Sequence, residues 1–278
     1  MHRTAGDDRF VTLRDGRSGL YCAAMSTPRF FCAELAPGVI TLEAAEARHA
    51  TQSLRLRSGD EVLLFDGRGR LAHGILRRDD ATGTGRSAGH GAKREGRAVC
   101  VTVERVLCEP PPERTLTLVV AGCKGPRLTW MIEKLTELGT TRVVIGEFER
   151  SVVHVAPTHA SRFRRTALEA AKQSQRAWLP EIRCGVRLAE AVETKSKGAL
   201  LVAHPAPDAP AFASQLHAPT LVEAHLTAVV GPEGGLTDAE VALLREKGGR
   251  LVRLAPGILR VETAAISLAA NWAAHQPL

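Results

Sequence analysis

The residues of this 278-residue chain that are best suited to chemistry lie near its C-terminus. Ala228–Leu236 reads AVVGPEGGL, and Leu254–Ala264 reads LAPGILRVETA. Each segment couples a short apolar strand to a loop that contains glycine and proline and opens a helix, which is how α/β proteins build small-molecule sites at strand ends. Two such loops close together predict one ligand that is bound by both.

Three polar residues cluster where the second segment enters an apolar helix: Arg260, Glu262 and Thr263. Glu262 could complement the helix dipole, and Thr263 could cap the helix. A cation at a helix N-terminus opposes the dipole, so Arg260 needs an anionic or carbonyl partner. The 231–235 loop alone is equally compatible with a tight turn whose glycines adopt positive φ.

The elements that must position these residues alternate between strand and helix. Thr237 and Glu240 have capping-box spacing, so the GPEGG loop leads directly into a helix. This alternation predicts an α/β domain with a mostly parallel sheet covered by helices. The predicted elements are strands at 116–121, 143–145, 226–230, 251–254 and one ending near His204, with helices at 128–138, 159–177, from Thr237 and after the last loop.

The first half carries strand patterns at 61–65, 71–76 and 98–106, which indicate a small β-rich domain. Residues 79–97 are rich in Gly and Arg and predict a long hairpin loop. Gly67–Ala72 and Gly83–Ala88 match G-x-G-x-x-A, but neither opens a helix, so we assign both to turns. Pro110–Pro112 marks the boundary between the two halves. We expect residues 1–27 to be a disordered N-terminal extension. The three aspartates of this segment argue against a targeting peptide.

The chain is basic, with 44% hydrophobic residues and a formal net charge of +7. This charge favours an anionic partner such as nucleic acid. No apolar run approaches the ~18 residues of a membrane helix. The six cysteines have no zinc spacing, and we expect reduced thiols in a cytoplasmic protein with no metal. Phosphate-loop, H-E-x-x-H and G-x-S-x-G motifs are absent.

Several short motifs are spread along the chain and follow one another in a defined order. They are Leu54–Arg57 with Gly59-Asp60 and Phe65–Gly67, Glu133-Lys134, Glu137–Gly139, Glu149–Ser151, Gln173–Arg176 with Leu179–Arg183, His204-Pro205, GPEGGL, and Ile258–Arg260 with Glu262–Ala264. This set resembles the RsmE family of 16S ribosomal RNA uracil-N3 methyltransferases, which belongs to the SPOUT class. The resemblance runs from about Pro28 to the C-terminus.

The resemblance implies an α/β fold in which a PUA-like RNA-binding β-barrel at residues 28–110 precedes a SPOUT methyltransferase domain at 114–278 with a deep trefoil knot. Residue patterns and general topology rules would instead predict an unknotted sheet. It also implies a homodimer that binds 16S ribosomal RNA within the small subunit, and S-adenosylmethionine held in the knot. The implied cofactor residues are His204, Pro205, Gly231, Pro232, Glu233, Gly234, Gly235, Leu254, Ile258, Leu259 and Thr263.

The hypothesis for the reaction is an attack by uracil N3 on the sulfonium methyl group, in which the protein supplies positioning and electrostatics. Arg260 neutralises charge on a uracil carbonyl oxygen, and Glu233 or Glu262 orients that arginine or handles the proton. Arg260 and Glu262 could instead only brace the knot. We expect RNA contacts from basic residues on both halves. These are Arg55, Arg57, Arg162, Arg165, Lys172 and Arg176.

The chain departs from the family pattern at a few positions. Gly257 stands where the family commonly has an arginine, Lys172 replaces a glutamate, and Thr140 replaces an apolar residue. Two alternative functions also stay open. The chain could be a SPOUT methyltransferase for another RNA position or a ribose oxygen, or an RNA-binding assembly factor without catalysis.

Overall fold

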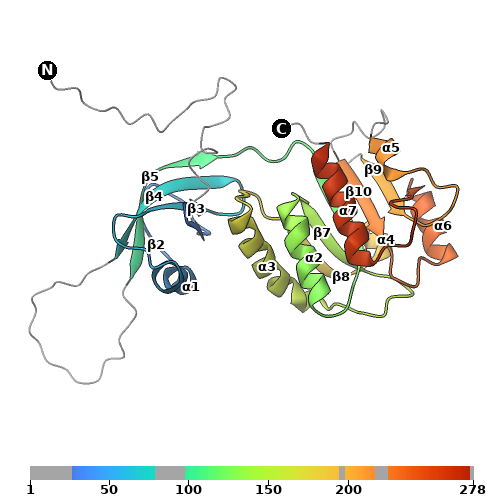
Figure 1. The fold of residues 1–278 in the computed structure, drawn as a ribbon, viewed down its shortest axis with the longest axis horizontal. Coiled ribbons are helices and arrows are strands. Elements are labelled where there is room, and N and C mark those ends of the chain that lie inside the picture. The colour runs from blue at the N-terminus through green and yellow to red at the C-terminus, as the bar shows by residue number, and fades with distance from the viewer. Residues whose placement is uncertain (1–26, 79–97, 194–197, 217–224, 276–278) are drawn as a thin grey trace, which may run out of the picture. The chain divides into compact units, whose positions relative to one another are not determined.

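The computed structural model describes residues 27–78, 98–193, 198–216 and 225–275. The N-terminal extension and the predicted 79–97 hairpin loop therefore lie outside the described residues, apart from residue 27. The described chain forms two compact units (Figure 1). The first ends at Glu109, and Gly67–Gly69 group with the second, which continues from Pro110.

The first unit is a five-stranded sheet with the order β1-β3-β4-β5-β2. Its core is apolar and includes Phe30, Leu64, Leu76 and Val101, none of which is measurably exposed. Strands β1 and β3 are parallel, and the other pairs are antiparallel. The elements are β1 (Arg29–Phe31), β2 (Gly38–Thr41), α1 (Ala44–Arg48), a π-helical turn (His49–Ser53), β3 (Glu61–Phe65), β4 (Arg70–Arg78) and β5 (Val99–Cys108).

Three predicted strands of this unit are confirmed as β3, β4 and β5, while β1 and β2 were not predicted. Both missed strands are short, and β2 is mostly exposed, so neither shows clear alternation. Residues 66–69 connect β3 to β4, which confirms that the first G-x-G-x-x-A match begins in a turn. The second match lies outside the described residues.

The second unit is a six-stranded sheet with the order β11-β9-β10-β6-β7-β8, and every described pairing is parallel. The strands are β6 (Thr115–Ala121), β7 (Arg142–Glu147), β8 (Glu181–Arg187), β9 (Ala199–Ala203), β10 (His225–Val230) and β11 (Arg250–Val252). The helices are α2 (Pro126–Glu137), a 3-10 turn (Pro157–His159), α3 (Ala160–Gln173), α4 (Leu188–Ala191), α5 (Phe212–Leu216), α6 (Asp238–Glu246) and α7 (Val261–Ala274). This confirms the predicted parallel α/β architecture.

Helix α7 packs against β6 and β10 and lies beside α2, as Figure 1 shows. Met131, Ile132 and Leu135 of α2 are buried against the sheet, because they recur at helical spacing on one face. The helix predicted at 159–177 ends earlier, at Gln173. Its sequence continues in a helical pattern, but Gln175 has a φ of 58° and breaks it.

Candidate active site

The predicted ligand loops follow adjacent strands of one parallel sheet. Strands β11, β9, β10 and β6 are neighbours in this order, and all four run in the same direction. Their carboxyl ends therefore meet at one edge, where α/β proteins bind ligands. The loops at this edge begin at Arg253, His204, Gly231 and Gly122, in the same strand order.

The 231–237 loop is compact and well anchored. The Gly235 N–H donates to the Pro232 carbonyl at 2.8 Å, and Gly235 has a φ of +75°. The Thr237 hydroxyl accepts from the Glu240 N–H, while the Glu240 carboxylate accepts from the Thr237 N–H, so the predicted capping box is confirmed. Pro232 is buried, whereas Glu233 and Gly234 are exposed.

A turn after β7 makes two further contacts to this loop and its helix. The Arg150 guanidinium donates through Nη1 to the Gly234 carbonyl at 3.0 Å. The Glu149 N–H donates to Oε1 of Glu240 at 2.9 Å. Glu149 and Arg150 were noted in the sequence only as part of a family motif, and nothing in the local pattern connects them with a loop more than eighty residues away.

The His204-Pro205 segment is joined to the end of β11. The His204 N–H donates to the Val252 carbonyl at 2.9 Å, and the Ala206 N–H donates to Nδ1 of His204 at 3.2 Å. Because Nδ1 accepts, the neutral ring carries its proton on Nε2. His204 is half-buried and Pro205 is exposed. This side chain can therefore offer a ligand one N–H donor.

The last loop, 254–260, is open by comparison. Leu254 and Leu259 are half-buried and pack against the core, but Ile258 is 88% exposed. Arg260 is exposed at the N-cap of α7, and within the described part of the chain its side chain makes no hydrogen bond or ion pair. Thr263 lies in the first turn and is exposed, so it does not cap the helix.

Glu262 is the buried acid of the site. It is only 5% exposed, and its Oε1 lies 3.7 Å from Nε of Arg127, at the start of α2. Among the described residues, its other oxygen, Oε2, has no hydrogen-bond partner. A buried carboxylate oxygen without a donor is costly, so this oxygen is well placed to accept from a bound group. Arg127 was not among the residues predicted for the site.

The pKa of the Cys123 thiol is affected by the negative charge of this acid. Burial, followed by the nearby carboxylates of Glu262 and Glu233, raises the pKa of the Cys123 thiol to about 11. The thiol therefore stays protonated near neutral pH. Both predicted acids of the site thus influence one buried residue just after β6, although Glu233 lies in the 231–237 loop and Glu262 in the first turn of α7.

Four of the predicted RNA contacts belong to α3 and the residues after it. Arg162 and Arg165 are exposed and line a hollow of about 760 Å³ between α2 and α3. Lys172 is half-buried and bonded to Glu169 at 3.0 Å, and Arg176 is half-buried. The lining of this hollow includes none of the strand-end loop residues.

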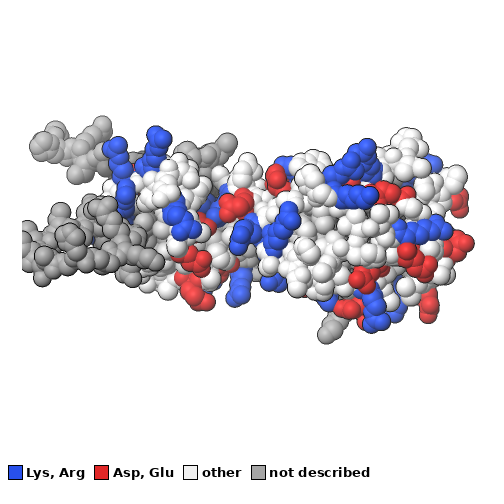
Figure 2. Space-filling model, turned by 90° about the horizontal axis from the view of Figure 1, so that it is seen from below, with Lys and Arg blue, Asp and Glu red and all other residues white. Residues whose placement is uncertain are grey.

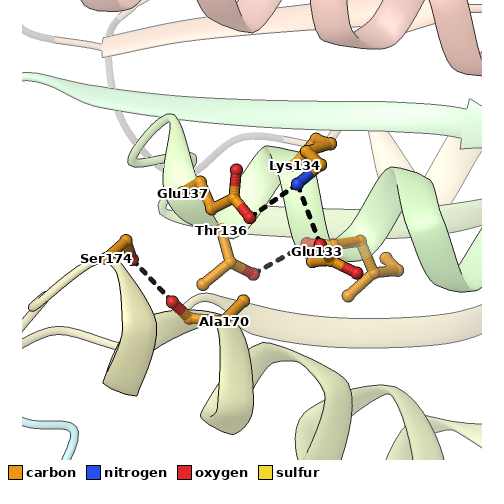
Figure 3. Close-up of polar contacts among 7 residues, drawn as sticks. Glu133, Lys134, Thr136, Glu137, Ala170 and Ser174 are labelled. Carbon is orange, nitrogen blue, oxygen red and sulfur yellow. Dashed lines mark hydrogen bonds and ion pairs between the residues drawn. The ribbon is translucent and has the colours of Figure 1, made fainter.

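The α2 side of the hollow is a network of charges. Figure 3 shows Lys134 bonded to both Glu133 and Glu137, each at 2.8 Å. On the face drawn in Figure 2, Lys and Arg side chains lie among Asp and Glu side chains rather than in one basic field.

The two predicted RNA contacts of the first unit lie between the π-helical turn and β3. Arg55 and Arg57 are both exposed, and Arg55 has a φ of 55°. The backbone N–H of Arg57 donates to Oδ2 of Asp60 at 2.7 Å and so fixes the turn. This bond does not involve the Arg57 guanidinium.

No group of three or more metal-binding side chains occurs among the described residues. The five described cysteines are free thiols, and no described helix is long and apolar enough to cross a membrane.

Comparison with known proteins identifies close similarities over most of the chain. The RNA methyltransferase domain family matches residues 110–273, and the RNA methyltransferase PUA domain family matches residues 42–81. The ribosomal RNA small subunit methyltransferase E of Mycobacterium tuberculosis is 31% identical over 237 residues, covering 82% of this chain and 83% of that protein. Its namesake from Synechocystis is 30% identical over 239 residues, covering 83% and 71%.

A crystal structure of the Neisseria gonorrhoeae ribosomal RNA small subunit methyltransferase E, bound to S-adenosyl methionine, superposes with a TM-score of 0.72. Its sequence is 26% identical, and the match covers 88% of this chain and 95% of that one. The same family is indicated by three observations: the sheet with its four convergent loops, the two family matches and the similar proteins. The chain belongs to the ribosomal RNA small subunit methyltransferase E family, with an N-terminal PUA-like domain and a C-terminal SPOUT methyltransferase domain.

Proposed function

We propose that this protein transfers a methyl group from S-adenosylmethionine to N3 of a uridine in 16S ribosomal RNA. One structural observation supports this most strongly. The buried Glu262 carboxylate has an oxygen without a donor at the edge where loops from four adjacent strands meet. S-adenosylmethionine carries an ammonium and an adenine amino group, and either could donate to such an oxygen.

The residues at this edge suit the cofactor. The loops around His204, Gly231 and Leu254 offer backbone N–H and carbonyl groups, and His204 adds an Nε2–H donor. When bound, S-adenosylmethionine supplies an activated methyl group on a positively charged sulfur. The proposed cofactor residues are His204, Pro205, Gly231, Pro232, Glu233, Gly234, Gly235, Leu254, Ile258, Leu259 and Thr263.

Arg260 is the proposed catalytic cation. It is exposed at a helix N-terminus and makes no hydrogen bond or ion pair within the described residues, so it can meet a uracil carbonyl oxygen as N3 loses its proton. Glu233 is exposed and could take up that proton. Glu262 is paired with Arg127, and its role in the proposal is to anchor that arginine and to accept a bond from the bound cofactor.

The RNA-binding part of the proposal assigns residues 28–110 to RNA recognition and 114–278 to methyl transfer. Arg55, Arg57, Arg162, Arg165, Lys172 and Arg176 would contact phosphates. We also propose a cytoplasmic homodimer that acts on the small ribosomal subunit, and a deep trefoil knot formed by the C-terminal loops. These assignments rest on family membership and the basic composition of the chain.

The test is transfer of tritium from labelled S-adenosylmethionine to small ribosomal subunits that lack the modification, followed by nucleoside chromatography. Label in N3-methyluridine supports the proposal. Label in another base or in a ribose methyl group would move the activity to a different RNA position. Cofactor binding without transfer would contradict this substrate, and failure to bind the cofactor would favour an assembly factor without catalysis.

A further inference from the structure

The 231–237 loop is held from outside by a turn that belongs to a distant part of the sheet. Residues 148–151 form this turn, in which the Ser151 N–H donates to the Phe148 carbonyl at 3.1 Å and the Phe148 N–H donates to the Ser151 hydroxyl at 3.3 Å. The two bonds fix the residues between them, Glu149 and Arg150. The turn can therefore present both of them in a defined orientation.

The turn reaches the loop although their strands are not neighbours. Strand β6 lies between β7 and β10, so the segment after β7 must cross the end of β6. Gly122 follows β6 at this crossing, and a Cβ atom there would lie 2.6 Å from the Val153 carbonyl oxygen. A side chain at this position would push the crossing segment away. The close approach of the two loops thus depends on a glycine at the end of a third strand.

Glu240 connects the turn and the loop through one buried carboxylate. The side chain is 6% exposed, and its two oxygens accept from different partners. Oε1 accepts from the Glu149 N–H at 2.9 Å, and Oε2 accepts from the Thr237 N–H at 2.8 Å. Helix capping alone needs only the second bond. The first bond has no role within the helix, and it joins two segments separated by 91 positions in the chain.

Arg150 completes the connection at the other end of the loop. Its Nη1 donates to the Gly234 carbonyl at 3.0 Å, and a Cβ atom at Gly234 would lie 3.2 Å from the Arg150 Cβ. The loop backbone therefore lies directly against the arginine stem. Arg150 and Glu240 hold the loop at two points, one near its glycines and one at its entry into α6.

We infer that Arg150 and Glu240 are positioning residues that hold the 231–237 loop in its cofactor-binding conformation before the cofactor arrives. This inference rests on the proposed function, because it takes S-adenosylmethionine as the ligand of the loop. Preorganisation strengthens binding, since the loop need not be ordered when the ligand binds. Neither residue is required to touch the cofactor or the uridine.

The first arm of the test measures the loop without any ligand. In Glu240→Gln, the side-chain NH2 group cannot accept, so one of the two backbone bonds is lost. Arg150→Ala removes the donor to Gly234. Hydrogen exchange in residues 233–236 of the free protein should become about tenfold faster in both variants, the factor expected when a hydrogen bond to a charged group is lost. Glu246→Gln, an exposed acid on the same helix, is the matched control and should leave exchange unchanged.

The second arm measures the cofactor. Titration calorimetry should give a Kd for S-adenosylmethionine that rises about tenfold in Arg150→Ala and Glu240→Gln, with kcat at saturating cofactor within about twofold of wild type. Arg150→Lys keeps a donor and should recover part of the affinity. A purely structural role would instead lower the melting temperature and leave the Kd unchanged, so that lysine at position 150 would have no lost affinity to restore.

The outcomes separate the two proposals. Unchanged exchange in both variants would overturn the inference, and so would faster exchange with an unchanged Kd. Faster exchange with a raised Kd, partial rescue by lysine and a normal kcat would support it. Wild-type protein that fails to bind S-adenosylmethionine would contradict the proposed function and the cofactor role, while the exchange arm would still decide whether these residues hold the loop.

Discussion

The two glycine-containing loops at the carboxyl edge of the sheet differ in how firmly they are held. The 231–237 loop is bonded to Arg150, and its helix is capped by a buried glutamate that is also bonded to the turn after β7. The 254–260 loop ends in an exposed arginine, and its Ile258 side chain is 88% exposed. The two loops follow β10 and β11, which both pair with β9.

This difference in anchoring predicts different roles for the 231–237 loop and for Arg260. A loop that is already ordered loses little conformational entropy when a ligand binds, so the 231–237 loop is suited to cofactor affinity. A loop with few contacts can adjust as ligands bind, so the 254–260 loop can close on the cofactor while Arg260 at its end is suited to the RNA base. We expect substitutions in the first loop to change cofactor affinity and substitutions at Arg260 to change the rate.

The largest effect is expected for Arg260→Ala. Loss of a cation aimed at developing negative charge should lower kcat by about 10²–10³, as the removal of one oxyanion-stabilising donor does. The Kd for S-adenosylmethionine should stay within about twofold of wild type. Steady-state methyl transfer and calorimetry measure the two quantities, with Arg245→Ala on α6 as the control. A rate close to wild type would show that Arg260 is not the catalytic cation.

Glu262→Gln should have the next largest effect. The variant keeps the shape of the side chain but removes the charge that faces Arg127 and the acceptor at Oε2. We expect kcat/KM to fall by about 10- to 100-fold, the range for loss of a hydrogen bond to a charged group. Methyl transfer at varied cofactor concentration measures this. If Glu262→Gln stays within threefold of wild type, the buried acid has no part in cofactor binding.

A matched pair of glycine substitutions compares the two loops directly. In Gly234→Ala the new methyl group meets Arg150 at 3.2 Å, whereas Gly257→Ala meets no atom within 4 Å. We expect Gly234→Ala to raise the Kd for S-adenosylmethionine by about tenfold, since it loosens the bond to Arg150. Gly257→Ala should change the free energy of unfolding by less than about 0.5 kcal/mol and leave the Kd unchanged. Equal effects on the Kd would remove the distinction between the loops.

The smallest expected effect concerns the Cys123 thiol, whose pKa of about 11 is raised first by burial, then by Glu262 and then by Glu233. Because a negative neighbour disfavours the thiolate, Glu262→Gln should lower this pKa, and Glu233→Gln should lower it less. Alkylation of the Cys123 peptide, followed by mass spectrometry between pH 8 and about pH 11, measures the shift. The reverse order would mean that Glu233 lies closer to the thiol than Glu262 in solution.

Much of the second unit was predictable because its local patterns are strong. Apolar runs identified β6 and β10, and the spacing of Thr237 and Glu240 predicted the cap of α6, which the structure confirms. Strand β8 was not predicted as a strand, although Ile182, Cys184 and Val186 alternate with polar residues. Gly185, with a φ of +64°, lies where the pairing of β7 with β8 shifts register, and a glycine within a strand pattern weakens the prediction of a strand.

The contacts between distant segments were not predictable from a single sequence. Arg127 is a cation in the first turn of a helix, the same signal that singled out Arg260, but it lies far from the two loops in the sequence. The bonds from Glu149 and Arg150 depend on a chain crossing over β6, which no local pattern encodes. Spacing predicts caps and faces, whereas the partners of buried charges follow from the order of the strands.

The central claim is that both loops bind one ligand, and hydrogen exchange with and without S-adenosylmethionine tests it most directly. We predict that the cofactor slows exchange in both the 231–237 and the 254–260 loops, and that the second gains more protection because it is open in the free protein. Protection in only one loop, or in neither, would contradict the claim.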